Sequence, residues 1–168
     1  MHCFLTERIE TPIGPMVLVA KDGVILLFEF EDAAGRVVRQ MKARFGDVEL
    51  QSTSNPFGIT ETIKNYFAGD IHAFDNLLTD GGGTEFERRV WAELKRIPVG
   101  TTVSYGNIAR KLGDLKHSRA VGTANGKNPI AIVVPCHRVI GADGSMIGYG
   151  GGIKRKEWLL RHEGALLL

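Results

Sequence analysis

Hydrophobic and polar residues alternate over the first part of the chain in the way that antiparallel strands require. Residues 4–10, 15–20 and 24–30 read FLTERIE, PMVLVA and VILLFEF. They are separated by TPIG and KDG, and an Asp-Gly pair is a strong signal for a tight hairpin turn. The pattern therefore predicts antiparallel strands joined by short turns at the start of the chain.

The pattern then changes to the spacing of amphipathic helices. Residues 33–45 predict a helix whose apolar side chains share one face: Val37, Val38, Met41 and Phe45. Residues 54–70 predict a second helix, with Pro56 near its start and Gly69 as its stop signal.

Three consecutive glycines at residues 81–83 indicate a linker between two parts of the chain. A phosphate-binding loop is the alternative, but the lysine-threonine ending and the preceding strand of that motif are missing. We therefore expect an N-terminal α/β domain, residues 1–80, and a C-terminal domain, residues 81–168, within a chain of 168 residues.

The C-terminal domain begins with three predicted helices. Thr84 is the expected cap of the first, with Glu87 completing a capping box. Its apolar stripe consists of Phe86, Val90, Trp91 and Leu94. Ser104 is the expected cap of the next helix, which ends at Gly113. A short helix rich in small residues follows over residues 117–128. Two short helices joined by a tight turn outline a helix-turn-helix, although many helical hairpins share this pattern.

The rest of the chain contains an apolar run, a flexible loop and a final helix. Residues 129–134 are apolar and lead into Pro135 and Cys136, and residues 141–152 form a glycine-rich loop. The final amphipathic helix covers residues 153–164. Its predicted inward side chains are Ile153, Trp158, Leu159 and Leu160.

Composition excludes several classes of protein. The chain is 43% hydrophobic and 24% charged, which is ordinary for a globular protein. We find neither a membrane-spanning apolar run nor a secretion signal, so we expect a cytoplasmic protein with no membrane partner. A disulfide between Cys3 and Cys136 is not expected in a reducing compartment, and the two form no C-x-x-C pair that would favour a metal site.

The net charge is only +2, but its distribution is uneven. Most acidic residues lie in residues 1–80. The second half carries a large set of basic residues: Lys95, Arg96, Arg110, Lys111, Lys116, Arg119, Lys127, Arg138, Lys154, Arg155, Lys156 and Arg161. This asymmetry is compatible with a polyanionic partner and, equally, with a solvated surface.

The candidate chemistry lies at Cys136, in the sequence PCHRVIG. A thiol becomes a nucleophile when it ionises, and a nearby imidazole such as that of His137 promotes this. However, neighbours in an extended strand point to opposite faces, and free cysteine is among the most buried residue types. From the local sequence alone, a buried structural cysteine is the better interpretation.

The wider pattern reverses this preference. From about Thr84 to the C-terminus, the chain closely resembles the O6-alkylguanine-DNA alkyltransferases. The resemblance is carried by four motifs in this order: SYG, SRAVGTANGKNP, PCHRVIG, and GYGGG with RKEWLLRHEG. Residues 1–80 match that family only in size and in the order of elements. The resemblance implies an α/β fold in two parts. A small sheet-plus-helices domain similar to RNase H precedes a mostly helical, winged helix-turn-helix-like domain.

The resemblance also implies an activity. In this family a cysteine accepts the alkyl group of O6-alkylguanine in a direct, stoichiometric and irreversible step that uses no cofactor or metal. The matching acceptor is Cys136, and O4-alkylthymine is a candidate second substrate. His137 matches the base that generates the thiolate through a water, and Glu163 matches the residue that orients it, as in a hydrolytic triad. Tyr105 matches a tyrosine that donates a proton to guanine N3.

The partner implied by the resemblance is double-stranded DNA that carries O6-alkylguanine, bound in its minor groove by a protein that is a monomer in solution. Cooperative binding along the DNA is a candidate property that the sequence does not decide. Arg119 matches a finger that replaces the extruded base, although a phosphate-contacting arginine is the ordinary alternative. The residues that allow close approach to the groove are Ala120, Gly122 and Thr123.

Further residues of the site are assigned by the same resemblance. Asn128 matches an asparagine that braces the turn before the cysteine. The substrate pocket matches Val139 and the loop from Met146 to Gly151, in particular Tyr149, Gly150 and Gly151. The carbonyls of Cys136 and Val139 are the expected acceptors for the guanine amine.

Three other functions compete with the transfer reaction. A damage-binding protein without transfer chemistry is disfavoured because the cysteine of PCHR is present. A cysteine hydrolase that uses Cys136 and His137 leaves the DNA-binding elements unexplained. A helix-turn-helix regulator is disfavoured because the second helix of this chain is rich in small residues, whereas reading the major groove needs larger side chains.

Overall fold

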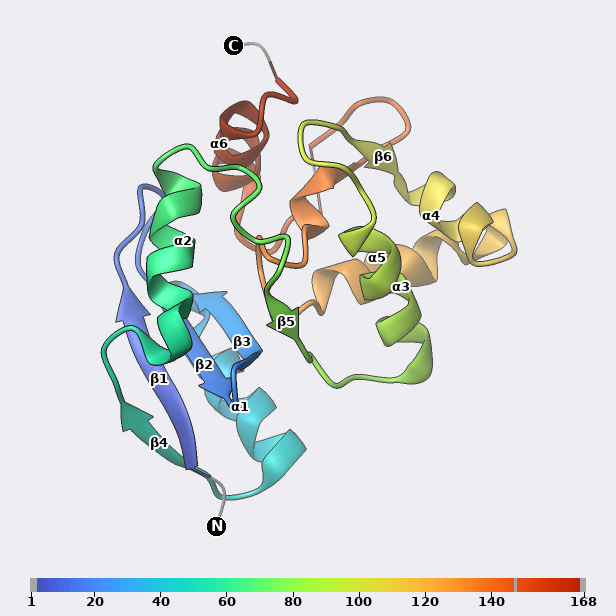
Figure 1. Ribbon diagram of the computed structural model, residues 1–168. Helices are drawn as coiled ribbons and strands as arrows, with labels where there is room; N and C mark the ends of the chain where they lie inside the picture. The colour runs from blue at the N-terminus through green and yellow to red at the C-terminus, as the bar shows by residue number, and fades with distance from the viewer. Residues whose placement is uncertain (1–2, 147, 167–168) are drawn as a thin grey trace. The chain divides into compact units, whose positions relative to one another are not determined.

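The structure is a computed structural model that describes residues 3–146 and 148–166, without the side chains of residues 34 and 37. The chain forms two compact units, and Figure 1 shows the elements of each. The units are Met1–Gly82 with Pro129–Ala131, and Gly83–Asn128 with Ile132–Leu168. The fold is mixed α/β: a five-stranded sheet with helices is followed by a helical region.

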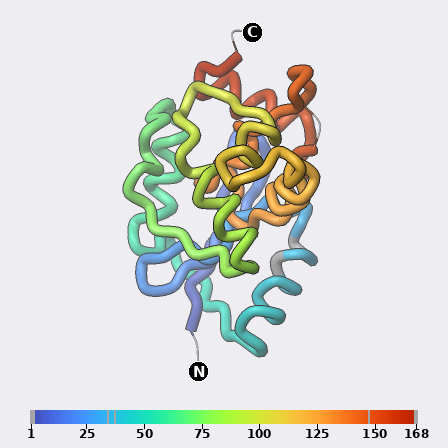
Figure 2. The backbone as a smooth tube through the Cα atoms, turned by 90° about the vertical axis from the view of Figure 1, so that its right-hand side faces the viewer, coloured from blue at the N-terminus to red at the C-terminus, as the bar shows by residue number. Residues whose placement is uncertain are grey.

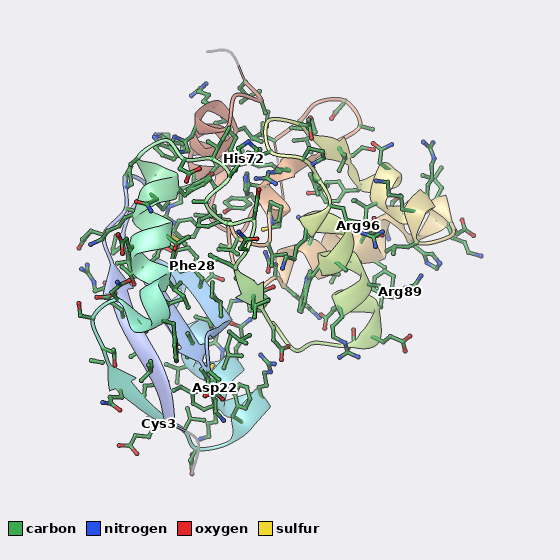
Figure 3. The ribbon with its side chains drawn as sticks, viewed as in Figure 1. Cys3, Asp22, Phe28, His72, Arg89 and Arg96 are labelled. Carbon is green, nitrogen blue, oxygen red and sulfur yellow. The ribbon has the colours of Figure 1, made fainter. Side chains whose placement is uncertain are left out.

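The centre of the first unit is the predicted antiparallel meander. β1 (Cys3–Ile9) pairs with β2 (Met16–Lys21), which pairs with β3 (Val24–Phe30). Asp22 and Gly23 form the β2–β3 turn with φ of 51° and 80°, the left-handed backbone that such a turn requires (Figure 3). The three predicted strands are confirmed.

The sequence pattern missed two strands of this sheet. The strand order is β4-β1-β2-β3-β5, and both added strands run parallel to their neighbours. All four residues of β4 (Glu49–Ser52) are exposed, so no alternation of buried and exposed positions marks this strand. β5 (Leu78–Thr79) has only two residues, too few for any periodicity.

Two helices cover the sheet, and Figures 1 and 2 show them on opposite faces. α1 (Ala34–Phe45) confirms the first predicted helix, and its Met41 is buried in a cluster that includes Phe4. Phe45 is partly buried against this cluster. The prediction for Val38 was wrong, because its side chain is 64% exposed. The side chain predicted at Val37 lies outside the described residues.

The second predicted helix is shorter than the sequence pattern indicated. α2 covers Ile59–Phe67, and a 3₁₀ turn over Pro56–Gly58 precedes it. Phe57 and Gly58 have φ of 54° and 75°, which is incompatible with a regular helix, so the helix cannot begin at Pro56. Gly69, with φ of 122°, follows the helix end as predicted.

The second unit begins with two well-capped helices. α3 (Glu85–Lys95) starts at the predicted capping box, in which Thr84 and Glu87 bond each other's backbone amides. Ser104 caps the start of α4 (Tyr105–Lys111), and Gly113 follows its end. These caps fix where each helix begins, and therefore where Tyr105 lies.

The remaining helices of this unit are α5 (Ser118–Gly126) and α6 (Ile153–His162). Leu159 and Leu160 of α6 are buried as predicted, and Trp158 is half-buried. The prediction for Ile153 was wrong, because this residue begins the helix and is 46% exposed.

The segment between α5 and Cys136 contains an unusual backbone feature. Phe28 of β3 donates to the carbonyl of Pro129 and accepts from the amide of Ala131, so residues 129–131 extend the first unit. Ile132 then has φ of 70°, a left-handed conformation that is strained for a β-branched residue. None of the helices in the described part of the chain is long and apolar enough to cross a membrane.

Candidate active site

Cys136 begins a short turn that buries three consecutive polar or reactive side chains. The 3₁₀ helix η4 (Cys136–Arg138) is closed by the amide of Val139, which donates to the carbonyl of Cys136. The exposed fractions are 7% for Cys136, 0% for His137 and 9% for Arg138. The chain is therefore not an extended strand at this point, and the two alternating faces assumed for a strand do not apply.

Glu163, directly after α6, holds the two residues that follow Cys136. Its Oε2 lies 2.9 Å from Nε2 of His137. Nε and NH2 of Arg138 donate to its two carboxylate oxygens at 2.8 and 3.1 Å, and NH1 of Arg138 donates to the carbonyl of Ile97 at 2.8 Å. One buried carboxylate therefore fixes both side chains of the turn.

These bonds keep Glu163 ionised. Burial alone raises the pKa of this carboxyl group, but the hydrogen bonds from His137 and Arg138 and the positive charge of Arg138 lower it from 4.5 to about 2. An ionised carboxylate can only accept hydrogen bonds. Nε2 of His137 must therefore carry the proton in their shared bond, and Nδ1 of the neutral ring carries a lone pair.

The electrostatic surroundings keep His137 neutral. Burial lowers the pKa of His137 below 6.5, the charges of Arg138 and Lys156 lower it further, and Glu163 opposes these effects. Nδ1 of His137 is buried and has no hydrogen-bond partner within the described part of the chain. A neutral imidazole with a buried, available lone pair is suited to accept a proton.

Tyr105 is the first residue of α4 and lies beside the glycine-rich loop. A Cβ atom on Gly148 would come within 2.7 Å of its hydroxyl oxygen, and one on Gly122 of α5 within 3.8 Å of its ring. These two glycines therefore leave the space that the tyrosine occupies. Burial raises the pKa of Tyr105, and negative charge on Cys136 raises it further, so the hydroxyl group keeps its proton.

Two buried asparagines brace the backbone on either side of Cys136. Nδ2 of Asn128 donates to the carbonyl of Val134 at 2.8 Å, which places this predicted residue in the turn before the cysteine. Asn125 of α5 was not predicted, and its Nδ2 donates to the carbonyl of Cys136 at 3.4 Å. Asn125 thus links α5 to the residue that carries the thiol.

The helix α5 has one buried face and one exposed face. Val121, Ala124 and Asn125 are buried. The predicted DNA-binding residues Arg119, Ala120 and Thr123 are exposed, whereas Gly122 is half-buried against Tyr105. The exposed face therefore consists of one long cation among small side chains.

The predicted pocket residues differ in how far they are buried. Val139 is fully buried, Tyr149 and Gly151 are half-buried, and Gly150 is exposed. Ile147, within the predicted Met146–Gly151 loop, lies outside the described residues. Over the described ranges, no group of three or more His, Cys, Asp or Glu side chains could hold a metal ion.

Two basic residues of the second half, Arg138 and Lys156, do not contribute to its surface charge. Both were counted in the basic half that favours a polyanion, yet both are buried. The other basic residues of that set, including the labelled Arg96 of Figure 3, are exposed, except Arg155, which is half-buried. A sequence signal for Lys156 did exist, since α6 buries residues at the helical spacing i, i+3, i+4 and i+7: Lys156, Leu159, Leu160 and Glu163.

The chain is similar to known proteins over nearly its whole length. The model of the family described as 6-O-methylguanine DNA methyltransferase, DNA binding domain, matches residues 85–165. The methylated-DNA–protein-cysteine methyltransferase of Shigella flexneri is 47% identical over 98% of each chain. That of Mycolicibacterium paratuberculosis is 45% identical over 94% of this chain and 90% of the relative.

Solved structures agree with these relatives. The O6-methylguanine methyltransferase of Mycobacterium tuberculosis matches 100% of this chain and 96% of its own, with a TM-score of 0.78 and 38% identity. A structure of OGT from the same organism in complex with DNA matches with a TM-score of 0.79 and 40% identity, over 96% of this chain and 93% of its own.

Proposed function

Because the chain belongs to the methylated-DNA–protein-cysteine methyltransferase family and repairs O6-methylguanine in DNA, we propose that Cys136 is the residue that accepts the methyl group. The observation that carries this assignment is the buried series of Cys136, His137 and Glu163. In it, an ionised carboxylate sets the tautomer of the imidazole that follows the thiol.

The transfer then proceeds as a direct displacement. Nδ1 of His137 accepts the thiol proton of Cys136 through a water molecule. The thiolate attacks the methyl carbon, a carbon–sulfur bond forms, and the bond from that carbon to O6 of guanine breaks. The electron pair of the broken bond returns to the guanine ring, and the hydroxyl group of Tyr105 protonates N3. Because the thioether is stable, each molecule reacts once.

A buried turn suits this chemistry. The thiolate is the nucleophilic form, and it attacks faster when water does not surround it. Asn125 and Asn128 hold the backbone on both sides of Cys136, so the sulfur keeps one position relative to the incoming base. The carbonyls of Cys136 and Val139 are the proposed acceptors for the guanine amine, and the loop at Tyr149–Gly151 is the proposed wall of the pocket.

DNA binding is assigned to the exposed face of α5. Small side chains at Ala120 and Thr123 let the helix enter a narrow minor groove, and Arg119 fills the stack after the damaged base is extruded. The second unit acts as a winged helix-turn-helix-like domain, and the first resembles an RNase H-like domain. A monomer is sufficient for this reaction, because all the proposed residues lie on one chain.

One experiment tests the acceptor assignment. The protein is mixed with an excess of duplex that contains O6-methylguanine, and its intact and peptide masses are recorded. We expect one added methyl group, located on Cys136, with no further turnover. Cys136→Ala is expected to gain no mass but still to bind the duplex, whereas Cys3→Ala serves as the control that reacts normally.

The same experiment distinguishes the competing functions. Tight binding to the lesion without any mass change would place the protein among damage-binding proteins. Methyl transfer to another residue would contradict the role of Cys136. O4-methylthymine in the same duplex tests the second candidate substrate.

A further inference from the structure

A buried lysine lies next to the reactive turn and has no role in the reaction derived above. The side chain of Lys156, in the middle of α6, is 0% exposed. Its Nζ donates a hydrogen bond of 2.5 Å to the carbonyl of Val139. Removing an ammonium group from water is costly unless negative charge or several hydrogen bonds compensate it. Its position therefore points to a negative charge that forms nearby.

The structure connects Lys156 to Cys136. The backbone of Val139 joins the two residues. Its carbonyl accepts a hydrogen bond from Nζ of Lys156, and its amide donates one to the carbonyl of Cys136. Burial lowers the pKa of Lys156, and negative charge on Cys136 raises it. Because this interaction is reciprocal, the ammonium group favours the thiolate to the same extent.

The other charged or titratable groups around the thiol do not provide the same standing charge. His137 is neutral before it accepts a proton, and burial lowers its pKa. Arg138 is bonded to Glu163 through two nitrogens, so its charge is already compensated. From α4, Tyr105 presents a hydroxyl group whose pKa is raised, and it therefore carries no charge.

We propose that Lys156 is a positioning residue for methyl transfer: its buried ammonium group stabilises the thiolate of Cys136 once His137 has generated it, and it ties the Cys136 turn to α6 through Val139. The proposal rests on the proposed function, in which Cys136 is the acceptor. Lys156 neither gains nor loses a proton in the reaction. It lowers the energy of the anion that His137 generates, and it loses its counter-charge when the thiolate becomes a neutral thioether.

The test measures the ionisation of Cys136 directly. A Cys3→Ser background leaves Cys136 as the only thiol, and ultraviolet absorbance of the thiolate is followed against pH. In this background, Lys156→Met is expected to raise the apparent pKa of Cys136 by about one unit or more. Lys156→Arg should restore most of the effect, and Lys154→Met, an exposed position on the same helix, should leave it unchanged.

The rate of methyl transfer provides a second readout. At neutral pH the rate of Lys156→Met should fall about tenfold for each unit of pKa increase, and it should recover at higher pH. A purely structural lysine would lower the rate at every pH without this recovery. A folded Lys156→Met with an unchanged thiol pKa would overturn the proposal.

Two further measurements keep the test decisive. If Lys156→Met does not fold, Lys156→Gln retains a donor for the carbonyl of Val139 and replaces it in both assays. The second measurement uses the protein without substitutions. The pKa of its Lys156 ammonium group, followed by nitrogen NMR, should be lower after Cys136 is methylated than before. An unchanged value would contradict the proposed charge pair.

The two proposals fail in different ways. If mass spectrometry finds no methyl group on Cys136 of the Cys3→Ser protein, the proposed function fails, whatever the thiol pKa. If Cys136 is methylated and its pKa does not respond to Lys156, only the inference about the lysine fails.

Discussion

Glu163 accepts a hydrogen bond from Nε2 of His137 at 2.9 Å, in a position where neither side chain is exposed to solvent. This relationship decides which nitrogen of the imidazole is available. With an ionised carboxylate on Nε2, the lone pair of the neutral ring is on Nδ1, the nitrogen that we assign as the base. The bond spans 26 residues of sequence and is made only when α6 packs beside the Cys136 turn.

Glu163→Gln should slow methyl transfer by about 10²–10⁴-fold, the usual contribution of a positioned base. A glutamine amide can donate to Nε2, which favours the opposite tautomer and protonates Nδ1. The single-turnover rate on duplex with O6-methylguanine measures the effect, and histidine nitrogen NMR reports the tautomer. Glu157→Gln, on the same helix, is the matched control. A normal rate in a protein with the opposite tautomer would contradict the role of Nδ1.

The stability of the protein should decrease as the pH falls, in two stages. His137 has a lowered pKa, so the unfolded state takes up its proton first and folding is penalised once the pH falls below about 6.5. Glu163 has a pKa lowered from 4.5 to about 2, so its contribution is present above 4.5 and is lost as the pH falls towards 2. This difference corresponds to about 3 kcal/mol.

Chemical denaturation at a series of pH values measures this dependence. In Glu163→Gln the loss of stability between about pH 5 and 2 should be much smaller, because the group that titrates in this window is absent. The variant should also be less stable at neutral pH by about 3–5 kcal/mol, since Arg138 is left buried without its carboxylate. An unchanged acid slope would show that Glu163 does not titrate as described.

Arg119→Ala should slow repair in duplex DNA at least about tenfold more than it slows reaction with the free base O6-methylguanine. Extrusion of a base costs a few kcal/mol, and a side chain in its place offsets part of this cost. The free base needs no extrusion. The ratio of the two rates is the measurement. Arg110→Ala, which removes an exposed cation of α4, should weaken DNA binding without changing that ratio.

Tyr105→Phe should reduce the transfer rate while the affinity for the duplex is kept, because only the proton donor is removed. A loss of about 10²-fold or more is expected. Gly148→Ala should give a similar loss, since its Cβ would lie 2.7 Å from the hydroxyl oxygen of Tyr105 and its φ of 90° is strained for alanine. Single-turnover rates and DNA affinity, measured side by side, check both. A full rate in Tyr105→Phe would remove the tyrosine from the mechanism.

Methylation of Cys136 should loosen α5. The thiol is 7% exposed, so an added methyl group must displace its neighbours, and Asn125 connects the carbonyl of Cys136 to this helix. Hydrogen exchange of the α5 amides, before and after reaction with excess damaged duplex, is the measurement. The capped helix α3 serves as the internal reference. Equal protection in both states would show that the turn accommodates the larger sulfur without movement.

The sequence by itself determined the elements whose signals are local. The Asp22-Gly23 hairpin, the capping box of Thr84 and Glu87 and the cap at Ser104 depend on neighbouring residues, so the pattern located them correctly. The motif around Cys136 also identified the family, because several motifs kept their order and spacing. Helix ends that depend on strained backbone were less predictable, and the start of α2 after Phe57 is the example.

Tertiary structure alone decided what surrounds the thiol. Arg138 did not look different from the exposed cations near it in the sequence, and only its helical spacing from Leu159 and Leu160 set Lys156 apart. Packing of α6 beside the Cys136 turn buries both. Their burial lets Glu163 stay ionised, keeps His137 neutral and places an ammonium group on Val139. Burial and charge pairing depend on contacts between distant segments, and those contacts have no local signature in the chain.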